Sequence, residues 1–489
     1  MWFILLIFLP FRSIIKYICL EGGVSLDFRQ FWDKISTKRI AMCGIGISNT
    51  PLILDFIKKG ATVYACDRRS REQIGELADR IESVGAELRL GNDYLNNLEV
   101  DIIFRTPGMS FHLPELRDAR KKGIAVTSEM EVFFDLCPAT IFAVTGSDGK
   151  TTTTTLIAEM LKAAGKTVHV GGNIGNPLLP EIDNIKPEDF VVVELSSFQL
   201  ISMRKSPDVA VITNVAPNHL DVHKDMDEYV EAKKNVILHQ NAFSRTVLNY
   251  DNEITNGFRD IVRGQSLGFS MERRVKNGAW YDGKGTLHMS YRGIDAPIMN
   301  KSDITILGDH NIANYLAAIS AVWGYVSAEN IRQVAKEFAG VEHRIEFVRE
   351  VSGVKYYNDS IASSPTRTIA GLKAFDQKVI LLAGGYDKHI PFEPMAETVI
   401  EKVKTLILCG PTADAIENAI IEHPNFSEGH PEIIKTNDLA ESIDLAHSLA
   451  VSGDIVTLSP ACASFDAFPN FAARGKFFKE KVMAFNGNN

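Results

Sequence analysis

The segment Val144 to Thr152 constrains the fold of this chain more than any other feature. It reads Val-Thr-Gly-Ser-Asp-Gly-Lys-Thr-Thr and lies between an apolar run, Thr140 to Val144, and a helical pattern. A strand, a small-residue turn and a helix start build a phosphate cradle, because backbone N–H groups and the helix dipole face the anion. Lys150 adds a positive charge, and Thr151 can hold Mg²⁺. Position 144 is Val where the strict motif has Gly, so a plain strand-to-helix turn stays open as the alternative.

Length and composition are those of an ordinary globular protein. The chain has 489 residues, enough for about three domains. Its net charge is −9, with acidic and basic residues mixed and no basic stripe, so we expect no nucleic-acid partner. The six cysteines are scattered without a C-x-x-C pair or metal-ligand spacing. This usage favours a reduced, cytoplasmic compartment.

The N-terminus is unusual. Trp2 to Leu9 is apolar throughout but much shorter than the ~20 residues that a membrane span needs. No basic residues precede it and no small-residue cleavage site follows it, so a signal peptide is poorly supported. We expect residues 1–23 to be a mis-annotated extension, with translation starting near Val24 to Leu26. A peripheral membrane anchor is the alternative; we expect no stable membrane insertion.

Strand-like runs alternate with helical patterns over most of the length, which predicts an α/β protein with largely parallel sheets. We expect three domains after the extension: 24–136, 137–340 and 341–489. Residues 265–305 predict an antiparallel insert, and Asn311 to Tyr325 a small-residue helix. The predicted strands are Arg39 to Cys43, Thr62 to Cys66, Asp101 to Arg105, Thr140 to Val144, Phe190 to Glu194, Val209 to Asn214, Lys378 to Leu382, Thr405 to Cys409 and Asp454 to Leu458.

The first predicted domain carries a glycine turn after its first strand. Gly44-Ile-Gly46-Ile-Ser48-Asn49 follows this strand, and Asp67 ends the next one. The pattern is similar to the dinucleotide-binding fingerprint, with its ribose-binding acid but without the third Gly. It predicts a nucleotide at this switch point, and a redox nicotinamide site is the weaker alternative.

Three further segments of the central domain carry polar or charged residues, and two of them suit cation binding. Glu194 ends a strand beside the phosphate loop, where a carboxylate can bind Mg²⁺. His219 follows the next strand and is a plausible second-cation ligand, although a polar loop is the alternative. Lys233 and Lys234 lie on a predicted helix, where adjacent side chains point ~100° apart and only one can face a given site. Taken alone, Lys233 and Lys234 would be interpreted as part of a solvent-exposed helix face.

Taken in order, these segments resemble the ATP-dependent Mur ligases of peptidoglycan synthesis, from about residue 38 to the C-terminus. Leu458-Ser-Pro-Ala-Cys-Ala-Ser-Phe-Asp466 is similar to the branch of that family that adds D-glutamate, and the Asp-Asn-Pro-Arg motif of the branch that adds diaminopimelate or lysine is absent from the sequence. The other matching segments are Thr145 to Thr152, Gly171 to Gly175, Glu194 to Gln199, Asn218 to Asp221, Glu231 to Lys233 and Gly308 to Asn314.

The resemblance implies a Rossmann-like N-terminal domain, a P-loop mononucleotide-binding central domain and a Rossmann-like C-terminal domain. The first would bind the UDP part of the substrate and the second ATP. The residues implied for the UDP substrate are Gly44, Gly46, Ser48, Asn49, Thr50, Asp67, Arg68, Thr106 and Asn173. Those implied for ATP are Gly146, Ser147, Asp148, Gly149, Lys150, Thr151, Thr152, Asn311, Asn314, Arg344 and Asp359.

The resemblance further implies two Mg²⁺ ions and a lysine carbamate made from CO₂. The implied metal ligands are Thr151, Glu194, His219 and Lys233 as carbamate; with Lys150, the last three form the implied catalytic set. Because CO₂ reacts with a neutral amine, the site has to lower a lysine pKa that is normally near 10.4.

For D-glutamate the family pattern implies the third domain. Its residues would be Ser363, Lys388, Ser464 and Phe471, with Ser464 at the start of a helix. Many relatives have Lys at the position of Ile361, so the contact which that lysine makes is either absent here or supplied from elsewhere, with Arg367 as the candidate. Cys462, in the same segment, is interpreted as a packing residue.

The implied reaction joins D-glutamate to UDP-N-acetylmuramoyl-L-alanine through an acyl phosphate, with ATP as the phosphoryl donor. We expect a cytoplasmic monomer. Three alternatives remain at this point. The chain could be another amino-acid-adding ligase of the same fold, a nicotinamide-dependent oxidoreductase that uses the first domain, or a non-catalytic nucleotide-binding scaffold.

Overall fold

The computed structural model of the chain describes residues 28–46, 49–217, 219 and 222–485. The expected N-terminal extension, residues 1–23, and the implied substrate residue Ser48 lie outside these ranges. All nine predicted strands form, with ends shifted by at most two residues, so the predicted α/β class is confirmed. No helix in the described ranges combines the length and the apolar content that crossing a membrane requires.

The chain separates into two compact units, each described here by itself. The first comprises Met1–Asp303 with Ile312–Lys336, and the second Ile304–Asn311 with Glu337–Asn489. Two sheets belong to the first unit and one to the second. The three domain boundaries expected from the sequence stay a prediction.

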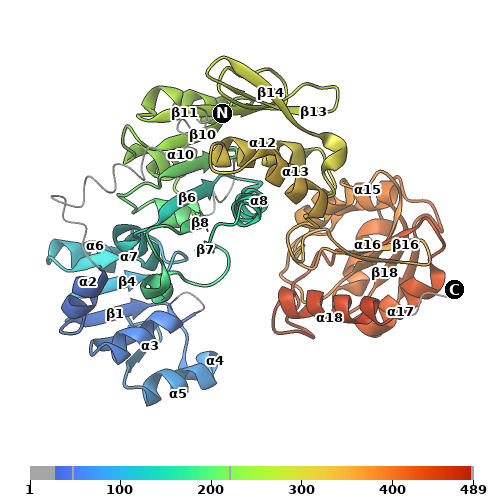
Figure 1. Cartoon of the computed structure of the whole chain (residues 1–489). Helices are drawn as coiled ribbons and strands as arrows, with labels where there is room; N and C mark the ends of the chain where they lie inside the picture. Colours follow the sequence, from blue (N-terminus) through green and yellow to red (C-terminus); the bar gives the residue numbers. More distant parts are fainter. Residues whose placement is uncertain (1–27, 47–48, 218, 220–221, 486–489) are drawn as a thin grey trace. The chain divides into compact units, whose positions relative to one another are not determined.

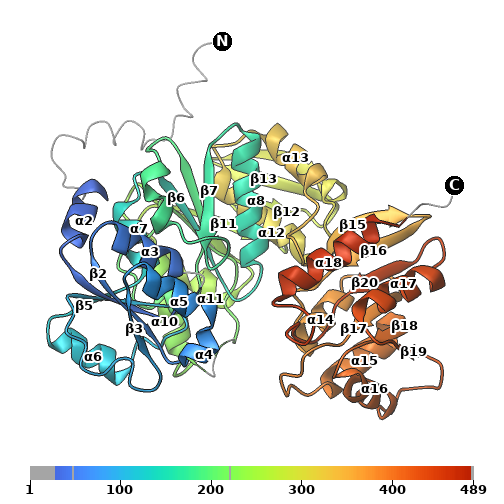
Figure 2. The ribbon, with the colours of Figure 1, turned by 90° about the horizontal axis from the view of Figure 1, so that it is seen from below.

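The first sheet is parallel throughout and has the strand order β3-β2-β1-β4-β5. Side chains alternate along β1, so Ile40 and Met42 join a core with Phe56 of α3, whereas Ala41 packs with Leu116 of α6 on the other face. Figure 2 shows α3 and α6 on opposite sides of this sheet. The strands are β1 (Arg39–Cys43), β2 (Thr62–Asp67), β3 (Glu87–Leu90), β4 (Ile102–Arg105) and β5 (Ala125–Thr127). The helices are α2 (Phe28–Ile35), α3 (Thr50–Lys58), α4 (Arg71–Ile74), α5 (Glu76–Ser83), α6 (Pro114–Lys121) and α7 (Glu129–Leu136).

The second sheet carries the phosphate loop between its strand β6 and the helix α8. Its order is β14-β13-β12-β11-β10-β9-β6-β8-β7, and α8 packs against β6, β7 and β8. The strands are β6 (Thr140–Thr145), β7 (Val168–Gly172), β8 (Phe190–Glu194), β9 (Val209–Ile212), β10 (Arg245–Asn249), β11 (Gln265–Ser270), β12 (Gly278–Tyr281), β13 (Thr286–Tyr291) and β14 (Ile294–Asn300). The helices are α8 (Lys150–Ala163), α9 (Ser197–Leu200), α10 (Met226–Leu238), α11 (Glu253–Asn256), α12 (His310–Val322) and α13 (Ala328–Glu337), with 3₁₀ turns η3 (Leu179–Asn184), η4 (Gly257–Ile261) and η5 (Lys301–Asp303).

The predicted antiparallel insert at 265–305 is correct only in part. Strands β12, β13 and β14 are antiparallel to one another, but β11 runs parallel to both β10 and β12. The reason is connectivity: α11 and η4 separate β10 from β11, and such a crossover returns the chain to the sheet in the same direction.

The two sheets of the first unit share one hydrophobic core. Phe104 of the first sheet and Val193 of the second belong to the same cluster of buried side chains, joined through Phe133 of α7 and Leu179 of η3. The buried Glu129 reinforces this junction, because its carboxylate accepts hydrogen bonds from the backbone N–H groups of Leu178 and Leu179. The first sheet is therefore packed onto the second sheet through this shared core.

The second unit contains a six-stranded sheet in the order β15-β16-β20-β17-β18-β19, parallel except for β15. Leu381 faces a core with α14, α15 and α16, whereas Ile380 and Leu382 face a core with α17 and α18. Figure 1 shows α15 and α18 on opposite sides of this sheet. The strands are β15 (Glu346–Val351), β16 (Val354–Asn358), β17 (Val379–Ala383), β18 (Val403–Leu408), β19 (Glu432–Lys435) and β20 (Ile455–Leu458). The helices are α14 (Pro365–Leu372), α15 (Glu393–Lys402), α16 (Ala413–Ile421), α17 (Leu439–Leu449) and α18 (Phe471–Met483).

Candidate active site

Two glycines give the phosphate loop its shape. Gly146 follows β6 with φ +154°, and a Cβ atom there would lie 1.9 Å from Thr213 Oγ1. Gly149 is the N-cap of α8 with φ +74°, and its Cβ would lie 2.3 Å from Asn314 Oδ1. Both positions need a residue without a side chain, so the loop is a specific structure and not a generic turn.

The loop is fastened by the residues that follow the neighbouring strand β9. The backbone N–H groups of Ser147 and Asp148 donate to Asn214 Oδ1 at 3.0 and 2.9 Å, and Thr213 Oγ1 donates to the Asp148 carbonyl at 2.5 Å. Lys150 Nζ donates to the Ser147 carbonyl at 2.9 Å. From the sequence, Asn214 was predicted only as the last residue of a strand; in the structure β9 ends at Ile212, and Asn214 follows it and contacts the loop.

Glu194 lies at the carboxyl end of β8 and joins two predicted site residues. Its side chain is buried, and its two oxygens accept from Thr151 Oγ1 and Asn173 Nδ2, each at 2.7 Å. The backbone N–H of Asn173 also donates to the Glu194 carbonyl at 2.8 Å. The structure thus brings together a carboxylate, a hydroxyl and an amide at the start of α8. Such oxygen donors are the ligands that Mg²⁺ prefers.

Lys233 of α10 is buried beneath the phosphate loop. Its Nζ donates to the Gly146 carbonyl at 2.8 Å and to Thr145 Oγ1 at 3.4 Å, and lies 4.6 Å from the centre of the Tyr229 ring. Burial, and then the positive charge of Lys150, lower the pKa of Lys233 to about 7. Only one of the two adjacent lysines faces the site, because Lys234 forms an ion pair on the helix surface with Glu231 at 2.5 Å.

The two histidines after β9 have different surroundings. His219 is exposed, has a left-handed backbone with φ +57° and lies edge-on to the Phe198 ring at 5.2 Å. His223 is buried; its Nε2 is 2.8 Å from Ser197 Oγ, and its Nδ1 is 3.2 Å from Glu228 Oε2. Over the residues that the structure describes, no group of three or more His, Cys, Asp and Glu side chains is arranged to hold a metal ion.

The glycine turn of the first sheet is closed by Thr106. Gly44 has φ +95°, and a Cβ there would lie 2.6 Å from Thr106 Cγ2. Asn49 is buried, and its Nδ2 donates to the carbonyls of Cys43 and Gly44 at 3.0 and 3.1 Å. These contacts bring Gly44, Asn49 and Thr106 together, and Thr50 begins α3 directly after Asn49.

Asp67 is held at this turn by a residue that the sequence did not single out. Its carboxylate accepts from the Ile45 backbone N–H at 2.7 Å and from Arg69 Nε and Nη2 at 3.0 and 2.9 Å. Burial raises the pKa of Asp67, but the hydrogen bonds from Arg69 and Ile45 outweigh it and leave the pKa lowered. The predicted Arg68 is exposed, whereas Arg69 contacts both Asp67 and the Ile45 carbonyl.

The two asparagines of α12 have separate partners. Asn314 is buried, and its Oδ1 accepts from Thr153 Oγ1 of α8 at 3.3 Å, close to Gly149. Asn311 is also buried, and its Nδ2 donates to the Leu307 carbonyl at 2.6 Å. Asn314 therefore lies at the phosphate loop, while Asn311 is hydrogen-bonded to the turn that precedes its own helix.

Asp359 is a buried carboxyl group at the end of β16. Its Oδ2 accepts from Ser459 Oγ at 2.7 Å, and its Oδ1 accepts from the Ile345 backbone N–H at 3.3 Å. Burial raises the pKa of Asp359 to about 7, although Ser459, Ile345, Arg344 and Arg367 oppose the rise. Arg367 Nη1 also donates to the Ile361 carbonyl at 3.2 Å, so the candidate guanidinium for replacing a lysine at position 361 does lie beside that position.

Three of the residues implied for D-glutamate, Ser363, Lys388 and Ser464, lie in loops that follow strands of the second unit, and Phe471 begins the helix α18. Lys388 Nζ donates to the Ser363 carbonyl at 3.4 Å, and the loop that carries Lys388 pairs with the 461–464 segment through Tyr386 and Ala463. Ser464 is buried in that segment. Phe471 lies at the first turn of α18, and its carbonyl accepts from Ser360 Oγ at 2.8 Å.

The expectation that Ser464 starts a helix is wrong. Residues after Ser464 form turns, and α18 begins at Phe471 with Asn470 as its N-cap, whose side chain accepts from the Ala473 backbone N–H at 2.8 Å. Pro469 explains the delay, because the residue before a proline is disfavoured in the helical region, and Asn470 then supplies a strong cap.

Arg474, which sequence reasoning missed, binds this region together. Its buried guanidinium donates to Ser360 Oγ and to the carbonyls of Ala463 and Cys462, each at 3.0 Å. Burial raises the pKa of the Cys462 thiol to about 11, so the thiol stays protonated. This fits the interpretation of Cys462 as a packing residue.

A phosphate loop next to an acidic strand end and a buried lysine defines a class of protein, the P-loop nucleotide-binding enzymes. The comparisons narrow the class. The profile of the Mur ligase middle domain matches residues 144–322, and that of the Mur ligase glutamate ligase domain matches residues 343–462. The chain belongs to the Mur ligase family, whose members use ATP and Mg²⁺.

Curated relatives match nearly the whole chain. Two proteins of Clostridium botulinum, each named UDP-N-acetylmuramoylalanine–D-glutamate ligase, are 51% and 49% identical over 458 and 457 residues, covering 93% of this chain and 99% of each relative. Among solved structures, a UDP-N-acetylmuramate–alanine ligase from Thermotoga maritima superposes with a TM-score of 0.55 at 18% identity, covering 92% of this chain and 100% of that one. That likeness shows a shared fold.

Gly146→Ala is expected to weaken ATP binding at least tenfold, because the new methyl group would collide with Thr213 Oγ1 and displace the loop. Gly165→Ala is the control: Gly165 also has a positive φ, of +73°, but nothing lies within 4 Å of the added Cβ. Calorimetric titration with an ATP analogue measures both variants. Equal affinities for the two would contradict the assigned role of Gly146.

Asp359→Asn is expected to change how stability depends on pH. A carboxyl pKa raised by burial means that the folded state holds its proton up to about pH 7, so stability is lost as the pH rises from about 4 to 7. The amide carries no charge and should escape this loss, at roughly 1.4 kcal/mol per unit of pKa shift. Melting temperatures compared between pH 4.5 and 8 measure the effect. A constant difference between wild type and variant would rule out the raised pKa.

Proposed function

We propose that this chain is an ATP-dependent ligase that joins D-glutamate to UDP-N-acetylmuramoyl-L-alanine during peptidoglycan precursor synthesis. The observation that carries the proposal is the identity of about half the residues, over 93% of the chain, with proteins named for that reaction. The site supports it, because the phosphate loop, Glu194 and Lys233 meet in one place.

The first step we propose is phosphoryl transfer. A carboxylate oxygen of the L-alanyl group attacks the γ-phosphorus of ATP, the bond to the β,γ-bridging oxygen breaks, and ADP leaves with that electron pair. The product is an acyl phosphate. Lys150 supplies positive charge at the loop where the phosphate oxygens would lie, and the loop amides position them.

Magnesium would neutralise phosphate oxygens in this step. Thr151 and Glu194 suit it, because they place a hydroxyl and a buried carboxylate side by side at the start of α8. We include His219 as a ligand and two ions as the stoichiometry, following the family pattern.

We also propose that Lys233 reacts with CO₂. Its nitrogen would attack the carbon of CO₂ and release a proton, which needs the neutral amine. A lysine with a pKa of about 7 holds a large neutral fraction at physiological pH, whereas an ordinary lysine holds almost none. The resulting carbamate would carry a negative charge beside Gly146, where an oxygen ligand for a cation is useful.

The second step forms the amide bond. The amine of D-glutamate attacks the acyl carbon, a proton leaves the nitrogen, and phosphate departs from a tetrahedral intermediate. Lys388 beside Ser363 offers a positive charge for a glutamate carboxylate, and Ser464 and Phe471 would complete the pocket. Water has to be excluded, since it would hydrolyse the acyl phosphate.

Family membership and the names of the relatives also bear on the three alternatives left open by the sequence. Family membership favours a ligase over an oxidoreductase or a scaffold, and the names of the relatives favour D-glutamate over other amino acids. The substrates are small molecules. We propose a cytoplasmic location, since ATP and a UDP-linked sugar are cytoplasmic compounds, and we keep the monomer as a separate proposal.

The purified chain is expected to release phosphate from ATP only when UDP-N-acetylmuramoyl-L-alanine and D-glutamate are both present. L-Glutamate, L-alanine and diaminopimelate serve as acceptor controls, and UDP-N-acetylmuramate as the control for the sugar nucleotide. A coupled phosphate assay with mass spectrometry of the product measures turnover. Equal turnover with L-glutamate, or none with D-glutamate, would refute the proposal.

Lys233→Ala is expected to abolish ligation, because it removes the group that the carbamate needs. Short carboxylic acids such as formate or acetate should restore part of the rate by occupying the same space. Lys234→Ala is the matched control, one position further along α10 but paired with Glu231 on the surface, and should retain the wild-type rate. A Lys233→Ala enzyme with near-normal turnover would overturn the role.

A further inference from the structure

The short helix α9 follows Glu194 and is held by residues of the first sheet through two separate routes. It begins at Ser197, and its side chains contact both histidines of the segment after β9. Neither route was visible in the sequence, because each joins residues about 90 or more positions apart. Both lie inside the first unit.

The first route is the guanidinium of Arg105, the last residue of β4. Arg105 is 2% exposed; its Nη2 donates to the Phe198 carbonyl at 2.9 Å and to Ser202 Oγ at 2.8 Å. Its Nη1 donates to the Met109 carbonyl at 3.2 Å, and the Met109 backbone N–H returns to the Thr106 carbonyl at 3.0 Å. One buried cation therefore binds the Thr106–Met109 turn, which carries an implied UDP-substrate residue, and the α9 segment at the same time.

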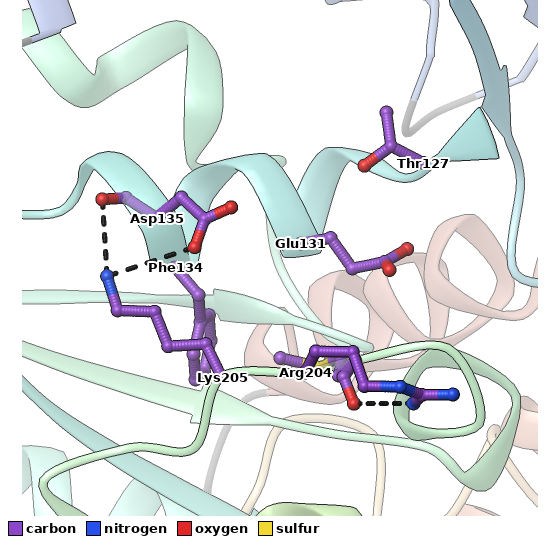
Figure 3. Close-up of a pocket in the computed structure, with 7 residues that line it drawn as sticks. Thr127, Glu131, Phe134, Asp135, Arg204 and Lys205 are labelled. Atoms are coloured by element: carbon purple, nitrogen blue, oxygen red, sulfur yellow. Dashed lines mark hydrogen bonds and ion pairs between the residues drawn. The ribbon is translucent and has the colours of Figure 1, made fainter. Parts of the chain in front are cut away.

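The charge of Arg105 is balanced through Ser202. Ser202 Oγ donates to Glu131 Oε2 at 2.9 Å, and Ser128 Oγ donates to the same oxygen at 2.8 Å. Figure 3 shows Glu131 on the wall of a pocket that Thr127 and Arg204 also line. The Arg105 guanidinium, the Ser202 hydroxyl and the Glu131 carboxylate thus form one hydrogen-bonded chain. Removing Arg105 would destabilise the fold, because the Phe198 carbonyl and Ser202 Oγ would lose their buried donor.

The second route runs through Glu228 at the start of α10. Its Oε1 lies 2.8 Å from His112 Nε2, in the loop that follows the Thr106–Met109 turn, and its Oε2 lies 3.2 Å from His223 Nδ1. His223 Nε2 in turn lies 2.8 Å from Ser197 Oγ. Consecutive residues of α9, Ser197 and Phe198, are thus each fixed from the first sheet.

The ring of Phe198 links the α9 backbone to His219, the implied metal ligand. It stacks on His223 at 5.0 Å with the rings 6° from parallel, and it lies edge-on to His219 at 5.2 Å. A displacement of the Phe198 backbone would move the ring surface against which His219 rests. A shift of about 1 Å in a catalytic group is enough to cost a reaction 100-fold.

We propose that Arg105 is a positioning residue for the ligation reaction: it couples the sugar-nucleotide turn at Thr106–Met109 to His219 through the backbone and ring of Phe198. The inference rests on the proposed function for the reaction that it affects, but the contacts that it explains stand independently. Arg105 does not touch the reacting atoms; it fixes the segment that orients a group near them.

The test compares Arg105→Met and Arg105→Lys with wild type in the full-length enzyme. Arg105→Met removes all three hydrogen bonds and should lower kcat 10- to 100-fold. Arg105→Lys keeps the charge but not the forked geometry, and should lower kcat about 3- to 10-fold. Calorimetric titration without ATP should show sugar-nucleotide affinity falling less than kcat does. If Arg105→Met does not fold, Arg105→Lys carries the comparison.

A double-mutant cycle separates positioning from general destabilisation. Phe198→Leu removes the ring that contacts His219, so adding Arg105→Lys to it should lower kcat by little more than Phe198→Leu alone. Effects on kcat that multiply independently would overturn the proposal. So would an Arg105→Lys enzyme with wild-type kcat.

Arg245→Met is the matched control for the loss of an internal guanidinium. Arg245 lies at the start of β10 and donates to the carbonyls of Ala321 and Trp323 at 2.8 and 2.7 Å. This variant should lose thermal stability without a change in kcat for the folded enzyme, and a matching fall in kcat would overturn the specific role of Arg105.

Hydrogen exchange tests the fixation of α9 by Arg105 without relying on turnover. Backbone amides 197–202 should exchange faster in the Arg105 variants than in Arg245→Met. If the wild type shows no ligation, the proposed function fails and with it the expected effect on kcat. Unchanged exchange at 197–202 would then also overturn the fixation of α9 by Arg105, whereas faster exchange would support that fixation.

Discussion

The hydrogen bond from buried Lys233 to the Gly146 carbonyl is the contact on which the site depends. It ties α10 to the first residue of the phosphate loop, and it is made by an amine whose pKa burial and Lys150 have lowered to about 7. Thr213 and Asn214 hold the same loop from the end of β9. The phosphate loop is therefore held by two elements, the helix α10 and the end of strand β9, and a site fixed in this way needs little rearrangement when a nucleotide binds.

Burial of polar groups recurs through the first unit. Glu194, Lys233 and Arg105 are each almost fully buried, and each is satisfied by hydrogen bonds instead of solvent. A buried charge without partners would cost several kcal/mol, so these networks fix one arrangement of the backbone around them. The core shared by the first two sheets also fixes the backbone, because it packs the strand before the Thr106 turn and the strand that ends at Glu194 into one body. The second unit has cores of its own around β17.

Much of the fold was predictable from local patterns. The nine strands follow from apolar runs bounded by turn residues, and the phosphate loop follows from small residues before Lys150, since these signals act over a few positions. The order of motifs then indicated the family and its implied site residues. Prediction failed where a local signal was overridden. The helix expected at Ser464 begins instead at Phe471, after Pro469, and β11 pairs with β10 in parallel because a helical crossover separates the two strands.

The sequence by itself determined the class of fold, the nucleotide loop and the identity of its lysine and threonine, because those features are encoded within short segments. Only the tertiary structure decided which residues support them. Three polar residues acquire roles only through partners that sheet order and core packing bring close. Asn214 accepts from the loop amides, Arg69 donates to Asp67, and Arg105 donates to the Phe198 carbonyl. The lowered pKa of Lys233 also depends on the tertiary structure, because desolvation comes from the residues that the fold packs around the amine.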